Sequence, residues 1–442
     1  MRLTDSMSSE NNRIGFYYYP DDQHYTQSDL NLWLPVLQSM GASWLTIQGS
    51  PDRAIPETFV RGLIEANIEP IIHILCKVGS VSTETIKPIL NSYARWGVRY
   101  VVVYDRPNLK SSWASSEWGR TGLVERYVDH LLPLLKAQES SGLIPVMPPL
   151  EPGGDYWDTA FIEAAFASFA RRGEQDLLQK LTLGIYAWTY GKPIDWGKGG
   201  SAQWSEARPY HTPPECEDQI GFRTFDWYVE IAEKVLQRAL PMIVIAGGEL
   251  PSDEAQGLGP DLHAEKNLAI ARALSSDEVP SEVKNFCFYH LASYPDSTDN
   301  NAAWHFTVDQ PRPVVSMIQR LMTAEAKQAP IQVEKHLQHY VLLPPRPSPQ
   351  YIQNWDVIGP FVLAVQPVVG FSPREARLAE MVTLFGDEQV IPKQVEEDLR
   401  STGCNVRRFT GTASREFLTK DGPARVTDQP KQESEYPGDP NA

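Results

Sequence analysis

The chain has 442 residues, of which 42% are hydrophobic and 22% are charged, a composition typical of a globular protein with enough apolar residues for a large core. Its formal net charge is -16, so it lacks the basic footprint that general nucleic-acid or anionic-membrane binding requires. No apolar run is long enough to span a bilayer, and we therefore expect neither nucleic-acid binding nor membrane insertion.

The amino-terminal residues 1–12 are polar and are expected to be flexible. They contain no apolar segment of the kind that signal peptides carry, so the chain as printed is expected to be cytoplasmic, or extracellular or surface-associated if a signal was removed. The four cysteines are widely spaced and form no metal-ligand pattern, and neither a phosphate-binding loop nor a nucleophile elbow occurs. We expect no cofactor and no metal.

Between residues 13 and 328 the sequence alternates short apolar strands with amphipathic helices. The predicted strands are 13–20, 44–49, 70–76, 100–105, 143–150, 181–188, 241–247 and 285–294. The predicted helices that follow them lie near 27–40, 56–67, 83–97, 122–138, 158–172, 224–240, 263–274 and 312–322. Eight such units favour an α/β fold, a (β/α)8 TIM barrel; an open doubly wound sheet is the alternative, but no glycine fingerprint follows the first strand.

The loops that follow the strands form the functional face of such a barrel. The loop after the sixth strand, about 189–222, is long and aperiodic, which is typical of a lid or binding loop; a surface insertion is the alternative. Aromatic residues are dense in these loops, and aromatic rings beside Asp, Asn and Glu suit the apolar faces and hydroxyls of sugars. The alternative is that several of these rings pack beneath the loops.

Two strand ends carry further information. The fourth strand ends in Asp105-Arg106-Pro107-Asn108, and the seventh runs PMIVIAGGE from Pro241 to Glu249. Residues 13–325 thereby resemble the retaining glycoside hydrolases of clan A, whose fourth strand ends in Asn-Glu-Pro-Asn and whose seventh reads Pro-apolar-apolar-x-Thr-Glu-Gly-Gly. The resemblance implies that Arg106 stands at the position of the acid/base glutamate and Ala246 at that of the nucleophile.

These replacements remove the groups that retaining hydrolysis needs, which are two carboxyl groups about 5 Å apart. Arginine stays protonated and cannot shuttle a proton, and alanine has no nucleophile. In those hydrolases the sixth strand commonly ends in a histidine, whereas here it ends in Tyr186-Ala187-Trp188. We expect a catalytically degenerate glycosidase-like barrel that binds carbohydrate or a glycan-bearing surface through an aromatic-rich acidic groove.

Two alternatives stay open. One is an active retaining O-glycosyl hydrolase with relocated carboxylates, Glu249 with Asp105 or Asp155. The other is a structural or assembly protein that uses the barrel as a scaffold, with an Asp105–Arg106 ion pair closing its mouth. The predicted ligand contacts are polar and aromatic side chains at strand ends and in the loops: Tyr17, Asp105, Arg106, Asn108, Trp113, Asp155, Trp157, Tyr186, Trp188, Glu249 and Trp304.

Residues 329–418 are expected to form a linker and a small α/β module. Its predicted helices are 349–363, 372–380 and 392–403, and its predicted strands are 340–344, 381–386 and 405–411. Residues 382–417 resemble one unit of a bacterial cell-wall-binding repeat, matching at Gly386, Ile391, Val395, Leu399, Val406, Arg408, Gly411 and Arg415 but with Asp387 for the second glycine. The module is therefore a candidate for binding a protein partner, or else a generic packing unit. Residues 419–442 lack a hydrophobic pattern and are predicted to be disordered.

Overall fold

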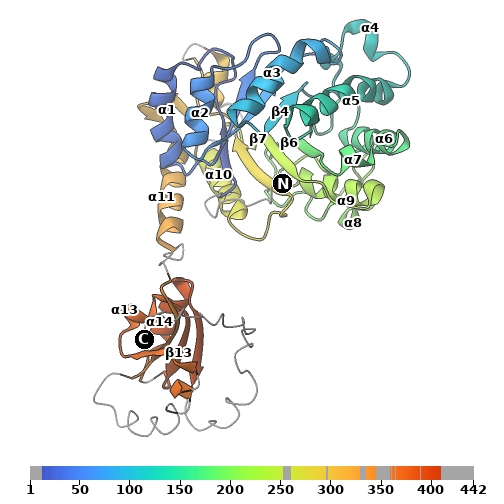
Figure 1. Ribbon diagram of the computed structural model, residues 1–442. Coiled ribbons are helices and arrows are strands. Elements are labelled where there is room, and N and C mark those ends of the chain that lie inside the picture. Colours follow the sequence, from blue (N-terminus) through green and yellow to red (C-terminus); the bar gives the residue numbers. More distant parts are fainter. Residues whose placement is uncertain are drawn as a thin grey trace, which may run out of the picture. The chain divides into compact units, whose positions relative to one another are not determined.

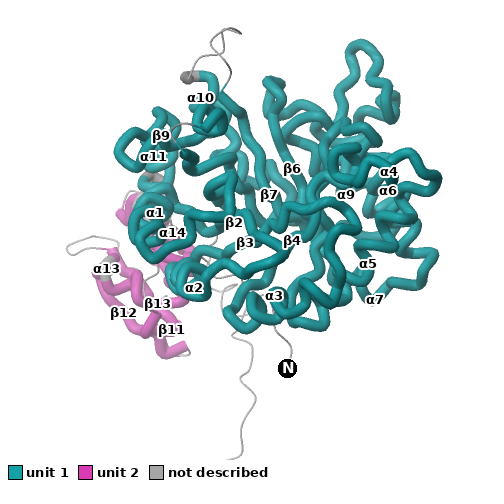
Figure 2. Tube along the Cα trace, turned by 90° about the horizontal axis from the view of Figure 1, so that it is seen from above, with its two compact units in different colours: residues 1–323 teal, residues 324–442 magenta. Residues whose placement is uncertain are grey.

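The structure, a computed structural model, describes residues 12–251, 260–294, 297–328, 335–344, 359, 361–363, 365–388 and 390–409. The chain divides into two compact units, Met1–Thr323 and Ala324–Ala442, which are coloured separately in Figure 2. Residues 1–11 of the flexible segment predicted at 1–12, most of the helix predicted at 349–363 and the disordered tail predicted at 419–442 lie outside the described residues.

The first unit is built on a parallel sheet, drawn in Figure 1. The sheet has eight strands, in the order β4-β3-β2-β1-β8-β7-β6-β5. Its strands are β1 (Ile14–Tyr17), β2 (Trp44–Gly49), β3 (Glu69–Ile74), β4 (Tyr100–Val103), β5 (Val146–Met147), β6 (Thr182–Trp188), β7 (Met242–Gly248) and β8 (Val283–Phe288). The remaining edges, β4 and β5, meet through an isolated parallel bridge between Tyr100 and Ile144. The predicted (β/α)8 barrel is therefore confirmed.

Helices surround this sheet, as Figure 2 shows in a view from above. The principal ones are α1 (Gln27–Ser39), α2 (Glu57–Glu65), α3 (Thr83–Trp96), α5 (Leu123–Ser141), α6 (Asp158–Arg171), α9 (Thr224–Leu236), α10 (Pro260–Leu274) and α11 (Pro313–Gln328). Shorter elements in the loops are the helices α4 (Ser115–Trp118), α7 (Gln175–Leu178) and α8 (Gly200–Gln203), the 3-10 turns at Lys110–Ser112 and Thr298–Ala302, and the antiparallel pair β9 (His305–Thr307) and β10 (Gln310–Pro311).

The barrel interior is filled below its carboxyl-terminal end. Side chains from alternate strand positions form one cluster there, including Trp44, Ile71, Tyr100 and Ile243. Gly15 makes room for this cluster, since a Cβ at that position would lie 2.7 Å from the Cβ of Trp44. The side chains of this cluster occupy the barrel interior below the strand ends.

The fifth strand is much shorter than predicted. The expected strand 143–150 contracts to β5, Val146–Met147, because Pro145, Pro148 and Pro149 have no backbone N–H to donate to a neighbouring strand. The chain after β5 therefore runs early into the loop that carries Glu151.

The second unit contains a four-stranded parallel sheet in the order β12-β11-β13-β14. Its elements are β11 (Leu337–Leu342), β12 (Val368–Gly370), α13 (Pro373–Ala376), β13 (Ala379–Phe385), α14 (Lys393–Ser401) and β14 (Asn405–Phe409). The smaller α/β region is thus present, although the helix predicted at 372–380 ends at Ala376 because the strand that pairs with β11 begins at Ala379. Of the residues matched to the cell-wall-binding repeat, Arg408 forms an ion pair of 2.7 Å with Glu396, while Gly411 and Arg415 lie outside the described residues.

Candidate functional site

A pocket of about 520 Å³ lies at the carboxyl-terminal end of the barrel strands. All eight strands or the loops that follow them contribute to it. The lining residues are Tyr17, Pro20, Gln48, Leu75, Asp105, Arg106, Glu151, Tyr186, Trp188, Thr189, Tyr190, Gly191, Ala246, Gly248, Glu249, Leu250 and Tyr289. The pocket occupies the face that a (β/α)8 barrel uses for ligands, within the size range of small-molecule sites.

Arg106 links two carboxylates on one side of this pocket. Its Nε donates to Asp105 Oδ2 at 2.8 Å, and its Nη1 lies 3.4 Å from Glu151 Oε2. The Tyr186 hydroxyl donates to Asp105 Oδ1 at 2.7 Å, and the Tyr190 hydroxyl donates to Glu151 Oε1 at 3.0 Å. Asp105 and Arg106 therefore pair as one alternative predicted, yet both still line an open pocket.

These contacts shift the protonation equilibria of the groups involved. Burial works against the charged guanidinium of Arg106, but Asp105, Tyr186 and Glu151 outweigh it and hold its pKa above the usual value. Burial, followed by the neighbouring charge of Asp105, raises the pKa of the Tyr186 hydroxyl well above 10. Burial also lowers the pKa of His73, which lies beneath Asp105 with Nε2 3.9 Å from Oδ1. Arg106 stays cationic, and Tyr186 and His73 are neutral at pH 7.

Glu249 lies on a second side of the pocket, where its carboxylate is paired with other side chains of the protein. The Nζ of Lys266 lies 2.9 Å from Glu249 Oε2 and donates to the carbonyl of Gly191 at 2.7 Å. The Thr189 hydroxyl also donates to Glu249 Oε2, and the backbone N–H of Glu249 donates to Asn267 Oδ1 at 3.0 Å. Lys266 thus ties the loops after β6 and β7 together at the pocket wall.

Four aromatic rings form a continuous wall, which we name the aromatic wall: Tyr17, Tyr289, Trp188 and Tyr186. The centroids of Tyr17 and Tyr289 are 5.3 Å apart, those of Tyr289 and Trp188 are 5.4 Å apart, and those of Trp188 and Tyr186 are 5.9 Å apart. Tyr17 and Tyr186 were predicted as ligand contacts from β1 and β6, and Trp188 from the end of β6. The structure brings all three together with Asp105, Arg106 and Glu249.

The backbone near the pocket adopts conformations that side chains other than glycine rarely take. Tyr104 has φ 78°, Arg106 has φ 44° and Tyr190 has φ 51°. Such residues cost free energy and concentrate at functional sites, where surrounding contacts hold them in place. The backbone N–H of Arg106 is held by the carbonyl of Pro149 at 3.0 Å, which fixes the turn that delivers the guanidinium to the pocket.

Two residues of the predicted site in the β4 loop are structural. Asn108 is fully buried and joins the loops after β4 and β5: its Nδ2 donates to the carbonyls of Glu151 and Tyr156, and its Oδ1 accepts from the N–H of Glu151. Trp113 is 2% exposed and donates from Nε1 to the carbonyl of Pro107 at 2.7 Å. Neither side chain reaches the pocket, because each is consumed in holding the loop.

Three further predicted contacts lie elsewhere. Trp304 is fully buried and packs edge-on against Phe16 with centroids 5.1 Å apart, so it belongs to the core. Asp155 accepts a hydrogen bond of 2.8 Å from the N–H of Lys110, and Trp157 packs on a loop tyrosine, with neither among the pocket-lining residues described. Asp155 is therefore not placed to act with Glu249 in the pocket.

Sequence reasoning missed several lining residues, of which Glu151 matters most. Glu151 directly follows the strand that the sequence predicts at 143–150, and that position was a usable signal. Gln48 at the end of β2 and Tyr289 just after β8 carry the same signal, whereas Tyr190 lies inside the long loop, where no periodicity marks it.

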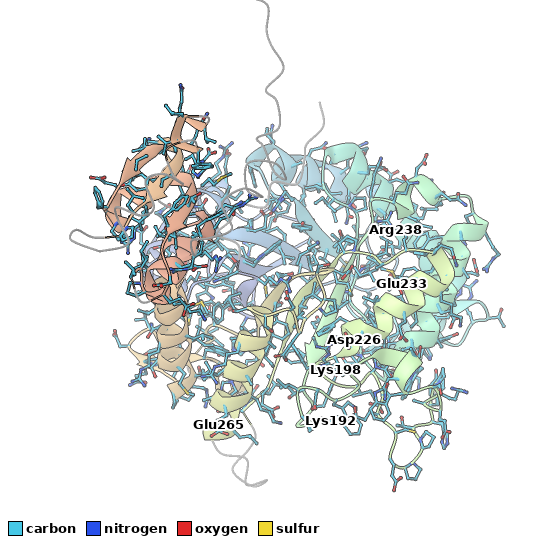
Figure 3. The ribbon with its side chains drawn as sticks, turned by 90° about the horizontal axis from the view of Figure 1, so that it is seen from below. Lys192, Lys198, Asp226, Glu233, Arg238 and Glu265 are labelled. Carbon is cyan, nitrogen blue, oxygen red and sulfur yellow. The ribbon has the colours of Figure 1, made fainter. Side chains whose placement is uncertain are left out.

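The long loop after β6 packs onto α9. The N–H of Gly199 donates to Asp226 Oδ2 at 2.9 Å, and Trp227 Nε1 donates to the carbonyl of Gly197 at 3.0 Å. Figure 3 shows Lys192 and Lys198 of this loop on the same side as Asp226 of that helix. The Nζ of Lys192 also lies 3.0 Å from Asp218 Oδ1, so the loop is anchored by its own ion pair.

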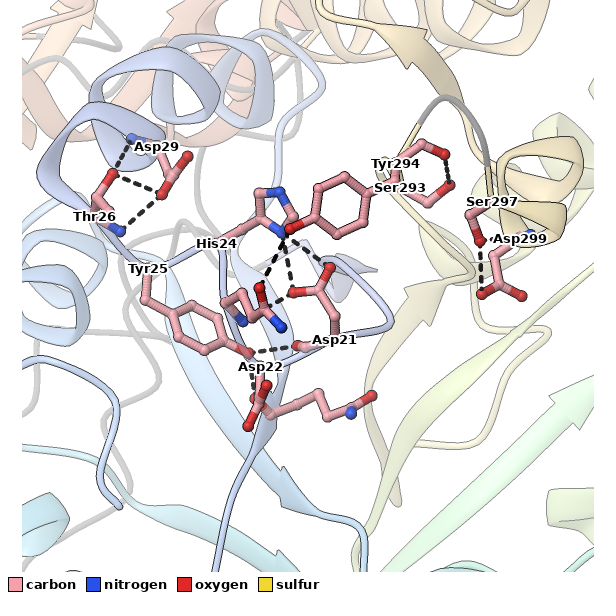
Figure 4. A network of polar contacts seen from close by, with 12 residues as sticks. Asp21, Asp22, His24, Tyr25, Thr26, Asp29, Ser293, Tyr294, Ser297 and Asp299 are labelled. Carbon is pink, nitrogen blue, oxygen red and sulfur yellow. Dashed lines mark hydrogen bonds and ion pairs between the residues drawn. The ribbon is translucent and has the colours of Figure 1, made fainter. Parts of the chain in front are cut away.

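The loop after β1 forms a polar network beside the pocket (Figure 4). The Nδ1 of His24 lies 2.9 Å from Asp21, and its ring stacks on Tyr19 with centroids 3.8 Å apart. The Tyr25 hydroxyl lies within hydrogen-bond distance of the carbonyls of Asp21, at 2.6 Å, and Gln48. This network holds the loop after β1 against the end of β2, where Pro20 and Gln48 enter the pocket lining.

The described part of the chain holds no group of three or more histidine, cysteine, aspartate or glutamate side chains arranged for a metal ion. It also has no helix with the length and apolar character needed to cross a bilayer.

No family model and no curated protein matches the sequence. Among solved structures, the chain is similar to a GH128 (subgroup II) endo-β-1,3-glucanase from Sorangium cellulosum, with 11% identity and a TM-score of 0.40 over 70% of this chain and 97% of that one. It is also similar to Saccharomyces cerevisiae Gas2p in complex with laminaripentaose, with 10% identity and a TM-score of 0.34 over 70% of this chain and 64% of that one. At these TM-scores the similarities carry no argument about function, and the barrel assignment rests on the sheet topology.

Proposed function

We propose that this protein binds a carbohydrate in the pocket at the end of the barrel and does not hydrolyse it. The observation that carries the proposal is the composition of the pocket. The aromatic wall lies beside carboxylates, and each described carboxylate of the lining forms an ion pair or hydrogen bonds with other side chains. Sugars present apolar C–H faces and polar edges, and this pairing of surfaces matches them.

The carboxylates support binding without hydrolysis. Among the described lining residues, Asp105 and Glu151 are held by Arg106 and Glu249 by Lys266, and each also accepts a hydrogen bond from a hydroxyl group. Retaining hydrolysis requires one carboxylate free to attack and one carboxyl group that can give and regain a proton. Carboxylates fixed in ion pairs are poorly placed for either task.

The resemblance to clan A glycoside hydrolases points the same way. Arg106 and Ala246, which it aligns with the two catalytic glutamates, both line the pocket. A site that keeps its position and its aromatic rings but lacks both reactive groups is suited to recognition.

The test is a glycan array followed by titration calorimetry with the glycans that bind. The Trp188→Ala variant is expected to bind at least about tenfold more weakly, since an aromatic anchor inside a pocket commonly contributes that much. Trp157→Ala is the matched control, because Trp157 is a half-buried loop tryptophan outside the pocket lining, and it is expected to bind like the unmodified protein.

Two outcomes would overturn the proposal. One is an absence of binding to any glycan by a correctly folded protein, which would favour the scaffold alternative. The other is equal loss of affinity in the Trp157 and Trp188 variants, which would place the ligand outside this pocket.

A further inference from the structure

We infer that the sugar bound in this pocket carries a primary ammonium group, as hexosamines with an unacetylated amino group do. The inference rests on the proposed function and adds the chemical class of the ligand to it. It comes from the balance of charge among the described residues of the pocket.

On the side of the pocket formed by the loops after β4 and β5, the guanidinium of Arg106 pairs with two carboxylates, those of Asp105 and Glu151. Arg106 is 2.8 Å from Asp105 but 3.4 Å from Glu151, so Glu151 is the more weakly matched of the two. Among the described side chains, the other partner of the Glu151 carboxylate is the neutral hydroxyl of Tyr190. This group of side chains therefore carries one negative charge in excess.

The other charged pair does not cancel this excess. Glu249 and Lys266 are 2.9 Å apart, and their side chains are 7% and 14% exposed, so they form a neutral unit at the wall. Counted together, the described charged groups at the pocket leave a net negative charge close to Glu151. A cation entering the pocket is attracted to this position, and an acidic sugar is repelled from it.

The pKa values of Tyr190 and Tyr186 also reflect the negative charge of the neighbouring carboxylates. Burial raises the pKa of the Tyr190 hydroxyl, and Glu151 is the next largest cause. For Tyr186 the neighbouring charge of Asp105 follows burial in the same way. Each carboxylate thus opposes the appearance of another negative charge beside it, which is the condition that favours a positive one.

The aromatic wall supplies a second source of attraction for an ammonium group. Trp188 and Tyr289 lie edge to face, with centroids 5.4 Å apart and planes at 83°, and both line the pocket. Ring faces attract cations, and tryptophan does so most strongly. A protonated amino sugar can contact the rings with both its C–H face and its ammonium group. An N-acetylated sugar can contact them with its C–H face but has no ammonium group.

The experiment is calorimetric titration at pH 6 with tetrasaccharides of glucosamine and of galactosamine, each in unacetylated and fully N-acetylated form. At least one unacetylated tetrasaccharide is expected to bind about tenfold or more tightly than its N-acetylated counterpart, and raising the salt concentration should reduce that ratio. In Glu151→Gln the ratio of the two affinities is expected to approach one, because the negative charge that favours the ammonium group is gone. Glu163→Gln, at an exposed glutamate of α6 paired with Lys234, is the control and should keep the full ratio.

The remaining outcomes decide against the inference. Equal or tighter binding of the N-acetylated forms would overturn it and leave carbohydrate binding in place. Equal affinity for 1,5-diaminopentane would overturn the assignment to a sugar. If the array detects other glycans while no amino-sugar tetrasaccharide binds, the inference fails alone; if the array detects none, the proposed function fails as well.

Discussion

Arg106, at the end of β4, determines how the carboxylates of the pocket are arranged. A glutamate there would have left a group able to move protons, whereas the guanidinium draws Asp105 and Glu151 into a fixed arrangement. Its positive φ of 44° and the hydrogen bond from its N–H to Pro149 hold it in that place. The site is therefore organised around a permanent cation.

Asn108 holds the loops after β4 and β5 together. Asn108→Ala removes three hydrogen bonds between the β4 and β5 loops and leaves partly buried backbone groups of Glu151 and Tyr156 without this partner. We expect the free energy of unfolding to fall by about 2–3 kcal/mol, measured by urea denaturation. Asn31→Ala on the exposed surface of α1 is the control, and a loss no larger than in that variant would contradict the structural role.

Some of the residues that line the pocket were predictable for a physical reason. Asp105, Tyr186 and Trp188 lie at strand ends, and in a barrel those ends converge on one face. The sequence alone could not distinguish Trp113 and Trp304 from the pocket-lining residues. It does not show whether an aromatic side chain in a loop faces a ligand or the core. Only packing distinguishes the two cases.

At the scale of elements, Lys266 connects one helix to two loops. It extends from α10 to the carbonyl of Gly191 after β6 and to Glu249 after β7. Thr189 adds a further link, since its N–H donates to the carbonyl of Gly248 at 3.1 Å. These contacts fix the wall of the pocket that carries Thr189, Gly191 and Glu249.

Lys266→Met is predicted to loosen this wall. The methionine keeps most of the aliphatic length but cannot bind Glu249 or Gly191, so amide hydrogen exchange in residues 189–191 should become faster. Ligand affinity should fall with it, although Lys266 is not among the pocket-lining residues described. Lys234→Met, at an exposed lysine of α9, is the control; unchanged exchange in Lys266→Met would show that the loops are held by other contacts.

Elements were predictable where the local pattern and the packing agree. Most strands and helices of the barrel have continuous apolar runs or helical periodicity, which is why their order was recoverable. The exceptions are β5, shortened by Pro145, Pro148 and Pro149, and the helix at 372–380, which yields to the pairing of β13 with β11. In both places hydrogen bonding across the sheet decided the outcome rather than the apolar pattern.

For the molecule as a whole, buried histidines contribute to the response of stability to acid. Burial, with a smaller effect of Arg312, lowers the pKa of His263 to about 4 and of His290 to about 3, against about 6.5 in the unfolded chain. The unfolded chain therefore binds these protons first, so their contribution to stability is complete above about pH 6.5. It is lost as the pH falls toward 4 and 3, by up to about 1.4 kcal/mol per pH unit for each histidine.

This dependence is testable with one pair of variants. His290→Leu is expected to flatten the decline in unfolding free energy between pH 6.5 and 4.5, whatever its effect on stability at pH 7. His130→Gln, on the exposed surface of α5, should keep the slope of the unmodified protein. A slope in His290→Leu equal to that of the control would show that His290 does not contribute.

The two units differ in how much their sequences reveal. The barrel repeats one unit eight times, and that repetition is what made its class predictable. The second unit offers only a short pattern, and a protein partner for it stays a prediction, as does its likeness to a cell-wall-binding repeat.

The central claim is that the pocket binds a carbohydrate without cleaving it, and one measurement tests it most directly. The protein is incubated at high concentration with each glycan that it binds, beside a panel of aryl glycosides, and products are quantified by mass spectrometry and by release of the aryl group. We predict saturable binding and no product above the buffer control. Turnover that disappears in Glu249→Gln or Glu151→Gln would contradict the account and establish a working hydrolase with relocated carboxylates.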